Sequence, residues 1–204
     1  MAGADANEEL VRKLRAGDKN ILAELFSCYR AQLRTMIDLR LDPRLNGRVS
    51  SSDILQETYL DALKRVEHFV QNQEMPFYLW LRLVAGQRIV DVHRQHLGAA
   101  MRDAGREVTL DGAHSPSASS YSIASRLAAH VDSPSQAAIR NETLQQLEQA
   151  LQEMDPMDRE VLALRHFEEL SNDEVAQLLN IKKAAASNRY VRALQRLKDI
   201  LSRA

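Results

Sequence analysis

The strongest constraint on the fold is the spacing of apolar residues, which recur every three or four positions along several long segments. This spacing puts them on one face of a helix. Strands would instead show short runs of alternating Val, Ile or Thr bounded by turn residues, which the sequence lacks, and helix-favouring Leu, Ala, Arg, Gln and Glu dominate. The sequence therefore predicts an all-α fold. The clearest example has apolar side chains at Leu22, Leu25, Phe26, Tyr29, Leu33 and Ile37.

The segment "VTLDGAHSPSASSYSIASRLAAHVDSPS" breaks this pattern. It is rich in Ser and Ala, contains two Ser-Pro steps and has little periodicity, which is typical of a linker. We expect at most one helical turn in it, near residues 123–129. A long connection without structure indicates two domains. The prediction is a helical domain at 1–106, a flexible linker at 107–135 and a second helical domain at 136–204.

Helix starts are predicted from capping residues. Ser52 or Asp53 is expected to cap a helix that follows the loop "DPRLNGRVSSS". Pro76 suits the first turn of the next long helix, and Asp155 can cap a helix that has Pro156 at its first position.

The carboxy-terminal segment carries a helix-turn-helix pattern. Ser171 followed by Glu174 matches a capping box at the start of a short helix. Asn180 tolerates the left-handed conformation that ends such a helix, and a second helix is expected from Lys182 or Lys183. A short helix, a tight turn and a second helix form this motif.

The second helix of the motif is predicted to have two faces. Its apolar face is expected to hold Tyr190, Val191, Leu194, Leu197 and Leu201. A cationic front in this position is typical of a helix that enters a DNA major groove, although a solvated, Arg-rich terminal helix would show the same charges. The candidate DNA contacts are Lys182, Lys183, Ser187, Asn188, Arg189, Arg192 and Arg196.

Two other segments narrow the family. "SDILQETYLDALKRVEHF" and "PFYLWLRLVAGQRIVDVHRQH" resemble the central region of bacterial sigma factors of the extracytoplasmic-function (ECF) type, and "LSNDEVAQLLNIKKAAASNRYVRALQRL" resembles the same family's carboxy-terminal region. Both regions occur in the family's order, and only the linker lies outside the resemblance. The matching positions are Asp53, Gln56 and Glu57; Phe77, Trp80 and Leu81; and Asp91 and Arg94.

The resemblance implies a region 2-like helical bundle, which docks on core RNA polymerase and contacts the downstream promoter element, and a region 4-like domain that reads the upstream element. The implied polymerase contacts are Asp53, Leu55, Gln56, Glu57, Tyr59 and Leu60. The implied downstream DNA contacts are Phe77, Tyr78, Trp80, Arg82, Gln87, Arg88 and Arg94. Core packing is favoured over base stacking for Trp80, whereas both interpretations stay open for Phe77 and Tyr78.

The sequence departs from the family pattern at several places. Gln87 stands where many members have Asn, Leu83 where they have Arg, and Ser187 where they have Lys. The connection at 39–52 is longer than usual. These differences bear on base preference and on polymerase docking.

Catalytic and metal-binding motifs are absent from the sequence. It has no phosphate-binding loop, dinucleotide fingerprint or nucleophile elbow, so we expect a protein that is not an enzyme and needs no cofactor. His93 and His96 lack the further ligands of a metal site. Cys28 is expected to be a small buried hydrophobe, and a single cysteine fits the cytoplasm. No apolar run approaches the roughly 20 residues that span a bilayer, so no membrane insertion is expected.

Three functions remain open. The leading hypothesis is a promoter-specificity subunit with core RNA polymerase and promoter DNA as partners. The resemblance also implies an anti-sigma factor, because sigma factors of this type are often held inactive by one. The alternatives are a stand-alone helix-turn-helix regulator and a helical adaptor that binds polymerase without reading DNA.

Overall fold

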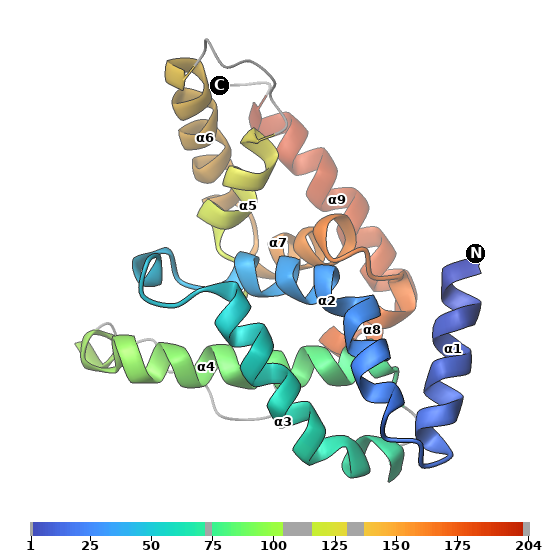
Figure 1. Cartoon of the computed structure of the whole chain (residues 1–204). Helices are drawn as coiled ribbons and strands as arrows, with labels where there is room; N and C mark the ends of the chain where they lie inside the picture. The colour runs from blue at the N-terminus through green and yellow to red at the C-terminus, as the bar shows by residue number, and fades with distance from the viewer. Residues whose placement is uncertain (1, 72–74, 104–115, 130–136, 202–204) are drawn as a thin grey trace. The chain divides into compact units, whose positions relative to one another are not determined.

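The computed structural model describes residues 2–71, 75–103, 116–129 and 137–201, and within these ranges the protein is built from helices (Figure 1). The all-α prediction is confirmed. The helices are α1 (Ala2–Arg15), α2 (Ile21–Arg40), α3 (Ser51–Gln71), α4 (Phe77–Asp103), α5 (Ser120–Ala128), α6 (Ala137–Gln152), α7 (Pro156–Leu162), α8 (Asn172–Leu179) and α9 (Lys183–Leu201). A 3₁₀ turn at Pro43–Leu45 follows α2, and a π-helical turn at Ala163–Phe167 extends α7.

The chain divides into two compact units. The first comprises Met1–Ile37 and Arg44–Pro116, and the second comprises Asp38–Pro43 and Ser117–Ala204. The second unit therefore takes in a short segment from the end of α2 and begins earlier than the predicted domain at 136–204. The predicted linker residues 107–115 and 130–135 lie outside the described residues.

The first unit is organised around the crossing of α3 and α4 (Figure 1). Its core holds an aromatic cluster in which the Phe69 ring lies 5.2 Å from Phe77 and 5.1 Å from Trp80. Tyr29 of α2 stacks on Tyr78 at 5.5 Å between ring centroids. This cluster ties the start of α4 to α2 and α3.

The amino-terminal end of α3 is capped by Ser50. Its hydroxyl accepts from the Asp53 N–H at 3.1 Å, and the Asp53 carboxylate accepts from the Ser50 N–H at 3.0 Å. The prediction that Ser52 or Asp53 would be the cap was wrong, because Asp53 instead occupies the reciprocal third position of a capping box. Gly47, with φ of 81°, supplies the left-handed residue that the preceding turn requires.

Helix α5 lies within the predicted linker and belongs to the core of the second unit. Ile123, Ala124 and Ala128 are buried together with residues of α6, and the Ser119 hydroxyl caps the helix by accepting from the Ser122 N–H at 3.3 Å. The small side chains that make this segment look like a linker also let α5 and α6 approach closely. The prediction of one helical turn near 123–129 thus underestimated the order of residues 117–129.

The second unit contains a buried ionic cluster. The Arg40 guanidinium pairs with the carboxylates of Glu160 and Glu168, the latter at 2.6 Å. Glu160 also accepts from the Ala118 N–H at 2.8 Å. Burial alone would lower the pKa of Arg40, but the two carboxylates outweigh it and raise that pKa above its ordinary value. The segment 38–43 is therefore held in this unit by charge as well as by Leu39, which is part of its core.

Several predicted helix ends of the second unit are confirmed. Asp155 caps α7 by accepting from the Met157 N–H at 2.9 Å, with Pro156 at the first position. Both bonds of the Ser171–Glu174 capping box are present at the start of α8. Asn180 ends that helix in the left-handed conformation, with φ of 52°.

Candidate functional site

Helices α8 and α9 form the predicted helix-turn-helix, and α9 packs against both α8 and α7. The buried side of α9 consists of Ala186, Ala193 and Leu197, with Tyr190 packed partly against the core. The Arg165 guanidinium lies 5.3 Å from the centroid of the Tyr190 ring. The motif that the sequence predicted is therefore present as a packed unit.

The predicted apolar face of α9 was partly wrong. The side chain of Val191 is 63% exposed, and Leu194 is exposed too, although both were expected to face the core. The helix is rotated about its axis relative to the prediction, because alanines at positions 186 and 193 allow it to approach its neighbours along a different stripe. Val191 and Leu194 then point away from the core, whereas Tyr190 and Leu197 pack against it as predicted.

The arginines of α9 point largely toward the turn between α6 and α7. The Arg189 Nη1 lies 2.6 Å from a carboxylate oxygen of Asp158, and the Arg196 guanidinium donates to the Glu153 carbonyl oxygen at 3.4 Å. Arg192 lies at the edge of this group, 4.0 Å from Asp158. Of these three arginines, Arg189 is thus paired closely with an acid of its own unit, Arg196 contacts a backbone carbonyl, and Arg192 stays largely exposed.

Other candidate DNA contacts lie around the start of α9. Lys182, Lys183 and Asn188 are exposed, and Ser187 is half-buried. Lys183 pairs with Asp173 of α8 at 2.7 Å. The structure brings three of the predicted residues together in a shallow hollow, which is lined by Ala185, Asn188, Arg189, Val191 and Arg192.

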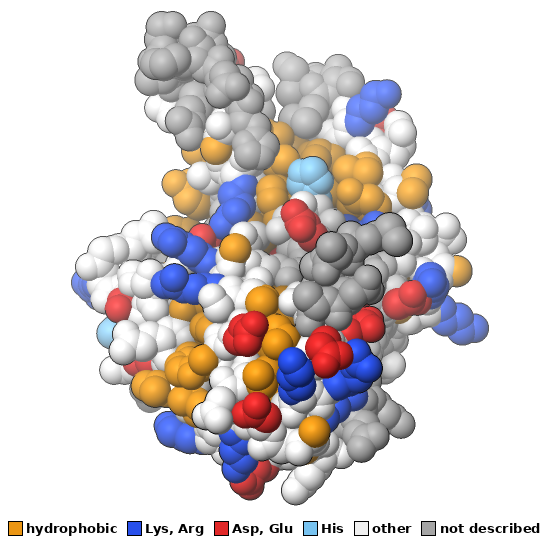
Figure 2. Space-filling model, turned by 45° about the vertical axis from the view of Figure 1, so that its right-hand side comes forward, with side chains coloured by type: hydrophobic (Ala, Val, Ile, Leu, Met, Phe, Trp, Pro, Cys, Tyr) orange, Lys and Arg blue, Asp and Glu red, His pale blue; other side chains and the backbone are white. Residues whose placement is uncertain are grey.

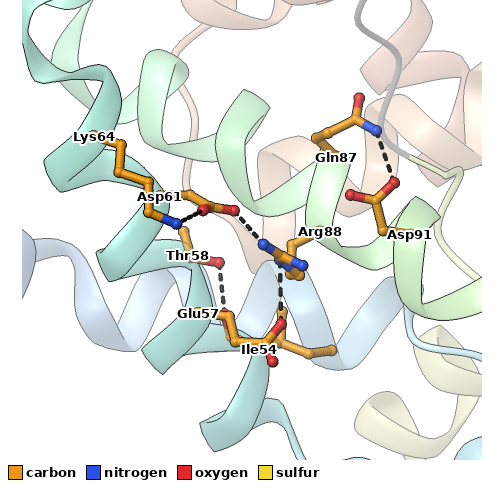
Figure 3. Close-up of polar contacts among 8 residues, drawn as sticks. All are labelled: Ile54, Glu57, Thr58, Asp61, Lys64, Gln87, Arg88 and Asp91. Carbon is orange, nitrogen blue, oxygen red and sulfur yellow. Dashed lines mark hydrogen bonds and ion pairs between the residues drawn. The ribbon is translucent and has the colours of Figure 1, made fainter.

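A second polar cluster joins α3 to α4 in the first unit (Figure 3). The Arg88 guanidinium of α4 reaches α3, where it pairs with Asp61 and lies 3.2 Å from a carboxylate oxygen of Glu57. Lys64 also pairs with Asp61, at 3.1 Å. Burial raises the pKa of Asp61, but its hydrogen bonds to Arg88 and Lys64 prevail and hold that pKa below its usual value.

The predicted downstream DNA contacts fall into two groups. Phe77, Tyr78, Trp80 and Arg82 are buried inside the first unit, so their side chains do not face solvent. Gln87 and Arg94 are exposed, and Arg88 is partly buried in its ion pairs. The Gln87 amide donates to the Asp91 carboxylate at 3.1 Å (Figure 3). For Trp80 the burial agrees with the core packing that the sequence favoured.

The predicted polymerase contacts lie on α3, and most of them reach the surface. Asp53, Gln56, Glu57 and Leu60 are exposed. Leu55 is buried, and Tyr59 is half-buried with its ring edge-on to Phe26 at 5.1 Å. Hydrogen bonds from Ser50 hold the pKa of Asp53 below its usual value, so the carboxylate stays charged.

Leu63 is an exposed apolar residue that the sequence analysis missed. It follows Leu60 by three positions, so both side chains lie on the same side of α3. The sequence did contain a signal for this position, because Leu60 and Leu63 are apolar residues on a side of α3 that also carries Gln56 and Glu67.

Comparison with known proteins finds similarity along most of the chain. Residues 144–197 match the family model described as Sigma-70, region 4. RNA polymerase sigma-H factor of Pseudomonas aeruginosa is 23% identical over 98% of this chain and 96% of its own length. The ECF RNA polymerase sigma factor SigD of Mycobacterium tuberculosis is 26% identical over 94% of this chain and 82% of its own. Over most of its length the chain is therefore similar to curated RNA polymerase sigma factors, including members of the ECF type.

The fold of the chain also resembles that of a solved structure. It is similar to the sigma factor RpoE in its complex with the anti-sigma factor NepR from Bartonella quintana, with a TM-score of 0.51. The two chains share 17% identity, and the match covers 90% of this chain and 98% of the other. The segment matched to region 4 contains all of α8 and most of α9, since the match ends at residue 197 and α9 ends at Leu201.

The exposed charges of the chain are of both signs (Figure 2). Figure 2 shows Lys and Arg side chains interspersed with Asp and Glu over the face it draws. Cys28 is exposed, so the expectation of a buried cysteine was wrong. Within the described ranges, three or more His, Cys, Asp or Glu side chains do not gather into a group that could hold a metal ion. Across the same residues, the helices are too short or too polar to cross a bilayer.

Proposed function

We propose that this chain is an ECF-type sigma factor, which binds core RNA polymerase and directs it to promoters through contacts in both of its units. The observation that carries the proposal is the helix-turn-helix of α8 and α9, which packs against α7 in the segment that matches region 4. Recognition and duplex opening by this route depend on binding energy, so the protein acts as an initiation factor without enzymatic chemistry. Its place of action is the cytoplasm, where polymerase works.

The roles divide among the helices as follows. The start of α9 faces the upstream promoter element and presents Lys182, Asn188 and Arg192 to it. The exposed residues of α4, Gln87 and Arg94, contact the downstream element, whereas the buried aromatic residues of α4 hold the helix in place. These assignments keep exposed members of the predicted sets and leave out Lys183 and Arg196, which contact Asp173 and the Glu153 carbonyl oxygen.

Helix α3 is the proposed polymerase-docking surface. Asp53 and Gln56 supply polar contacts, and Leu60 together with Leu63 supplies apolar area. A mixed acidic and apolar face suits a protein partner better than a polyanion, because its carboxylates would repel phosphate. Burying the exposed side chains of Leu60 and Leu63 against a partner would also be favourable, because it removes apolar surface from water.

An anti-sigma factor is a further proposed partner. RpoE, whose fold this chain resembles, was solved in complex with one. For this chain we propose an anti-sigma factor that competes with core polymerase for binding to it. The two-domain division with a connecting linker is part of the same proposal.

Co-elution with core polymerase tests the docking surface. The full chain is mixed with core enzyme lacking a specificity subunit and passed over a sizing column. We expect the wild type to co-elute and Leu60→Asp to be retained at least tenfold less, while Arg65→Asp, an exposed change on another side of α3, retains binding. Absence of wild-type co-elution, together with tight binding to a palindromic duplex without polymerase, would instead support a stand-alone regulator.

A further inference from the structure

The arginines of α9 are not equivalent, although the sequence gives them the same charge. Arg189 and Asp158 lie 2.6 Å apart, and their side chains are only 31% and 10% exposed. Arg192 is 64% exposed and reaches the same carboxylate only at 4.0 Å. A short, charge-assisted hydrogen bond that is mostly removed from water is costly to break, since either partner would be left with an uncompensated charge.

The acceptor is itself held in a fixed place. Asp158 lies in the first turn of α7, where its N–H donates to the cap residue Asp155 at 3.4 Å. Asp155 is also 3.9 Å from Arg189. The guanidinium of Arg189 therefore binds to the amino-terminal end of α7 rather than to a mobile surface group.

The packing of α9 gives this ion pair a geometric role. The buried stripe of α9 includes Ala186 and Ala193, whose side chains are too small to resist rotation of the helix about its axis. A fixed bond from Arg189 to α7 opposes such rotation. The orientation that it sets leaves Asn188, Val191 and Arg192 along the exposed hollow.

We propose that Arg189 is a positioning residue, which acts through Asp158 to fix the orientation of α9 and does not itself contact DNA. Asn188 and Arg192 are then the side chains of this group that meet the upstream element. This inference rests on the proposed function. It differs from the sequence-based expectation, in which Arg189 was one of the DNA contacts.

A salt titration separates positioning from phosphate contact. The full chain, bound to core polymerase, is titrated with a labelled duplex selected from a random library by the wild-type complex. The variants are Arg189→Met combined with Asp158→Asn, which keeps the net charge, and Arg192→Met. Loss of one phosphate contact makes the wild-type-to-variant affinity ratio fall about threefold between roughly 50 and 200 mM salt.

We expect the double variant to bind the duplex about tenfold more weakly than the wild type, a loss within the range of coupling energies between residues in contact. Its wild-type-to-variant affinity ratio should not change with salt. For Arg192→Met the ratio should fall about threefold over that range. Discrimination against single-base changes in the upstream element should also weaken in the double variant, which a loss of folded protein alone would not produce. A salt-dependent ratio for the double variant, equal to that of Arg192→Met, would overturn the inference.

The single variant Asp158→Asn separates the two roles of Arg189, because they predict opposite changes in DNA affinity. If Arg189 acts through Asp158, this change weakens binding by about the same factor as the double variant, because the orientation of α9 is lost in both. If Arg189 contacts DNA, releasing it from the carboxylate leaves binding unchanged or tighter. Glu153→Gln removes an exposed acid from the same turn without removing the partner of Arg189, and it controls for the general gain from a lost negative charge.

Failure of the inference and failure of the proposed function are distinguishable. A wild-type complex that selects no duplex contradicts the proposed function, whatever the variants do. A wild type that binds, with Asp158→Asn at least as tight, contradicts only the positioning role. Arg189→Lys provides the conservative variant, and it should recover part of the affinity because it restores the charge without the planar guanidinium.

Discussion

Replacing Arg40 by methionine leaves two carboxylates in the interior of the second unit without their cation. The side chains of Arg40 and Glu168 are fully buried, and that of Glu160 is 12% exposed. Removing one partner of a buried ion pair costs about 3–5 kcal/mol, because the remaining charge is desolvated and uncompensated. We expect a loss of this size in the free energy of unfolding of the second unit, which is a large fraction of the roughly 5–15 kcal/mol that stabilises a domain.

Hydrogen exchange on the full chain measures this loss where it arises. Protection of the amides in α6 and α7 should fall by about two to four orders of magnitude in Arg40→Met, following the conversion of about 1.4 kcal/mol per tenfold. Trp80, the only tryptophan, lies in the core of the first unit, so its fluorescence reports whether that unit stays folded.

Two further variants test whether charge is the reason. Adding Glu160→Gln and Glu168→Gln to Arg40→Met removes the uncompensated charges and should recover at least half of the lost protection. Arg126→Met breaks a half-exposed pair with Asp38 in the same unit and should cost less than about 1 kcal/mol. If the triple variant were as unstable as Arg40→Met, loss of packing would explain the effect, and the electrostatic reasoning would be refuted.

Three other outcomes are expected. Ser171→Ala should destabilise the second unit by about 1 kcal/mol, measured as lost amide protection in α8, and an unchanged protection would argue against the cap. Asp61, whose pKa is lowered in the folded protein, contributes stability that is present above its unfolded pKa of about 3.9 and is lost as the pH falls through its folded pKa. Asp61→Asn should therefore lower the urea midpoint of Trp80 fluorescence at pH 7 and flatten its decline in acid; an equally steep decline would contradict this. Leu63→Asp should weaken co-elution with core polymerase at least fivefold. Its urea midpoint, measured by Trp80 fluorescence, should change only as little as for other surface substitutions. Full binding by this variant would remove Leu63 from the docking surface.

Local features of the fold could be predicted from the sequence with good accuracy. The capping box at Ser171 and the left-handed Asn180 depend on residues within a few positions of each other, so their pattern alone determines the structure. The same holds for Asp155 and Pro156 at the start of α7. The helix-turn-helix followed from these local signals.

Features that depend on distant packing could not be predicted. Val191 was placed on the wrong side of α9, because the stripe that packs is decided by how closely Ala186 and Ala193 approach neighbouring helices. The partner of Arg189 lies 31 positions earlier, and that of Arg40 lies 120 positions later, so neither pair leaves a local pattern. The sequence counted Arg189 as a DNA contact because only its charge was visible.

Run-off transcription by core polymerase tests the central claim most directly. Core enzyme lacking a specificity subunit is supplied with the full chain and a duplex selected by the complex, and transcript ends and protected positions are mapped together. We predict transcripts from one defined start, with protection at an upstream and a downstream element, and loss of the upstream protection in Arg192→Met. Transcripts that are no more abundant or defined with the chain than without it would contradict its role as a promoter-specificity subunit.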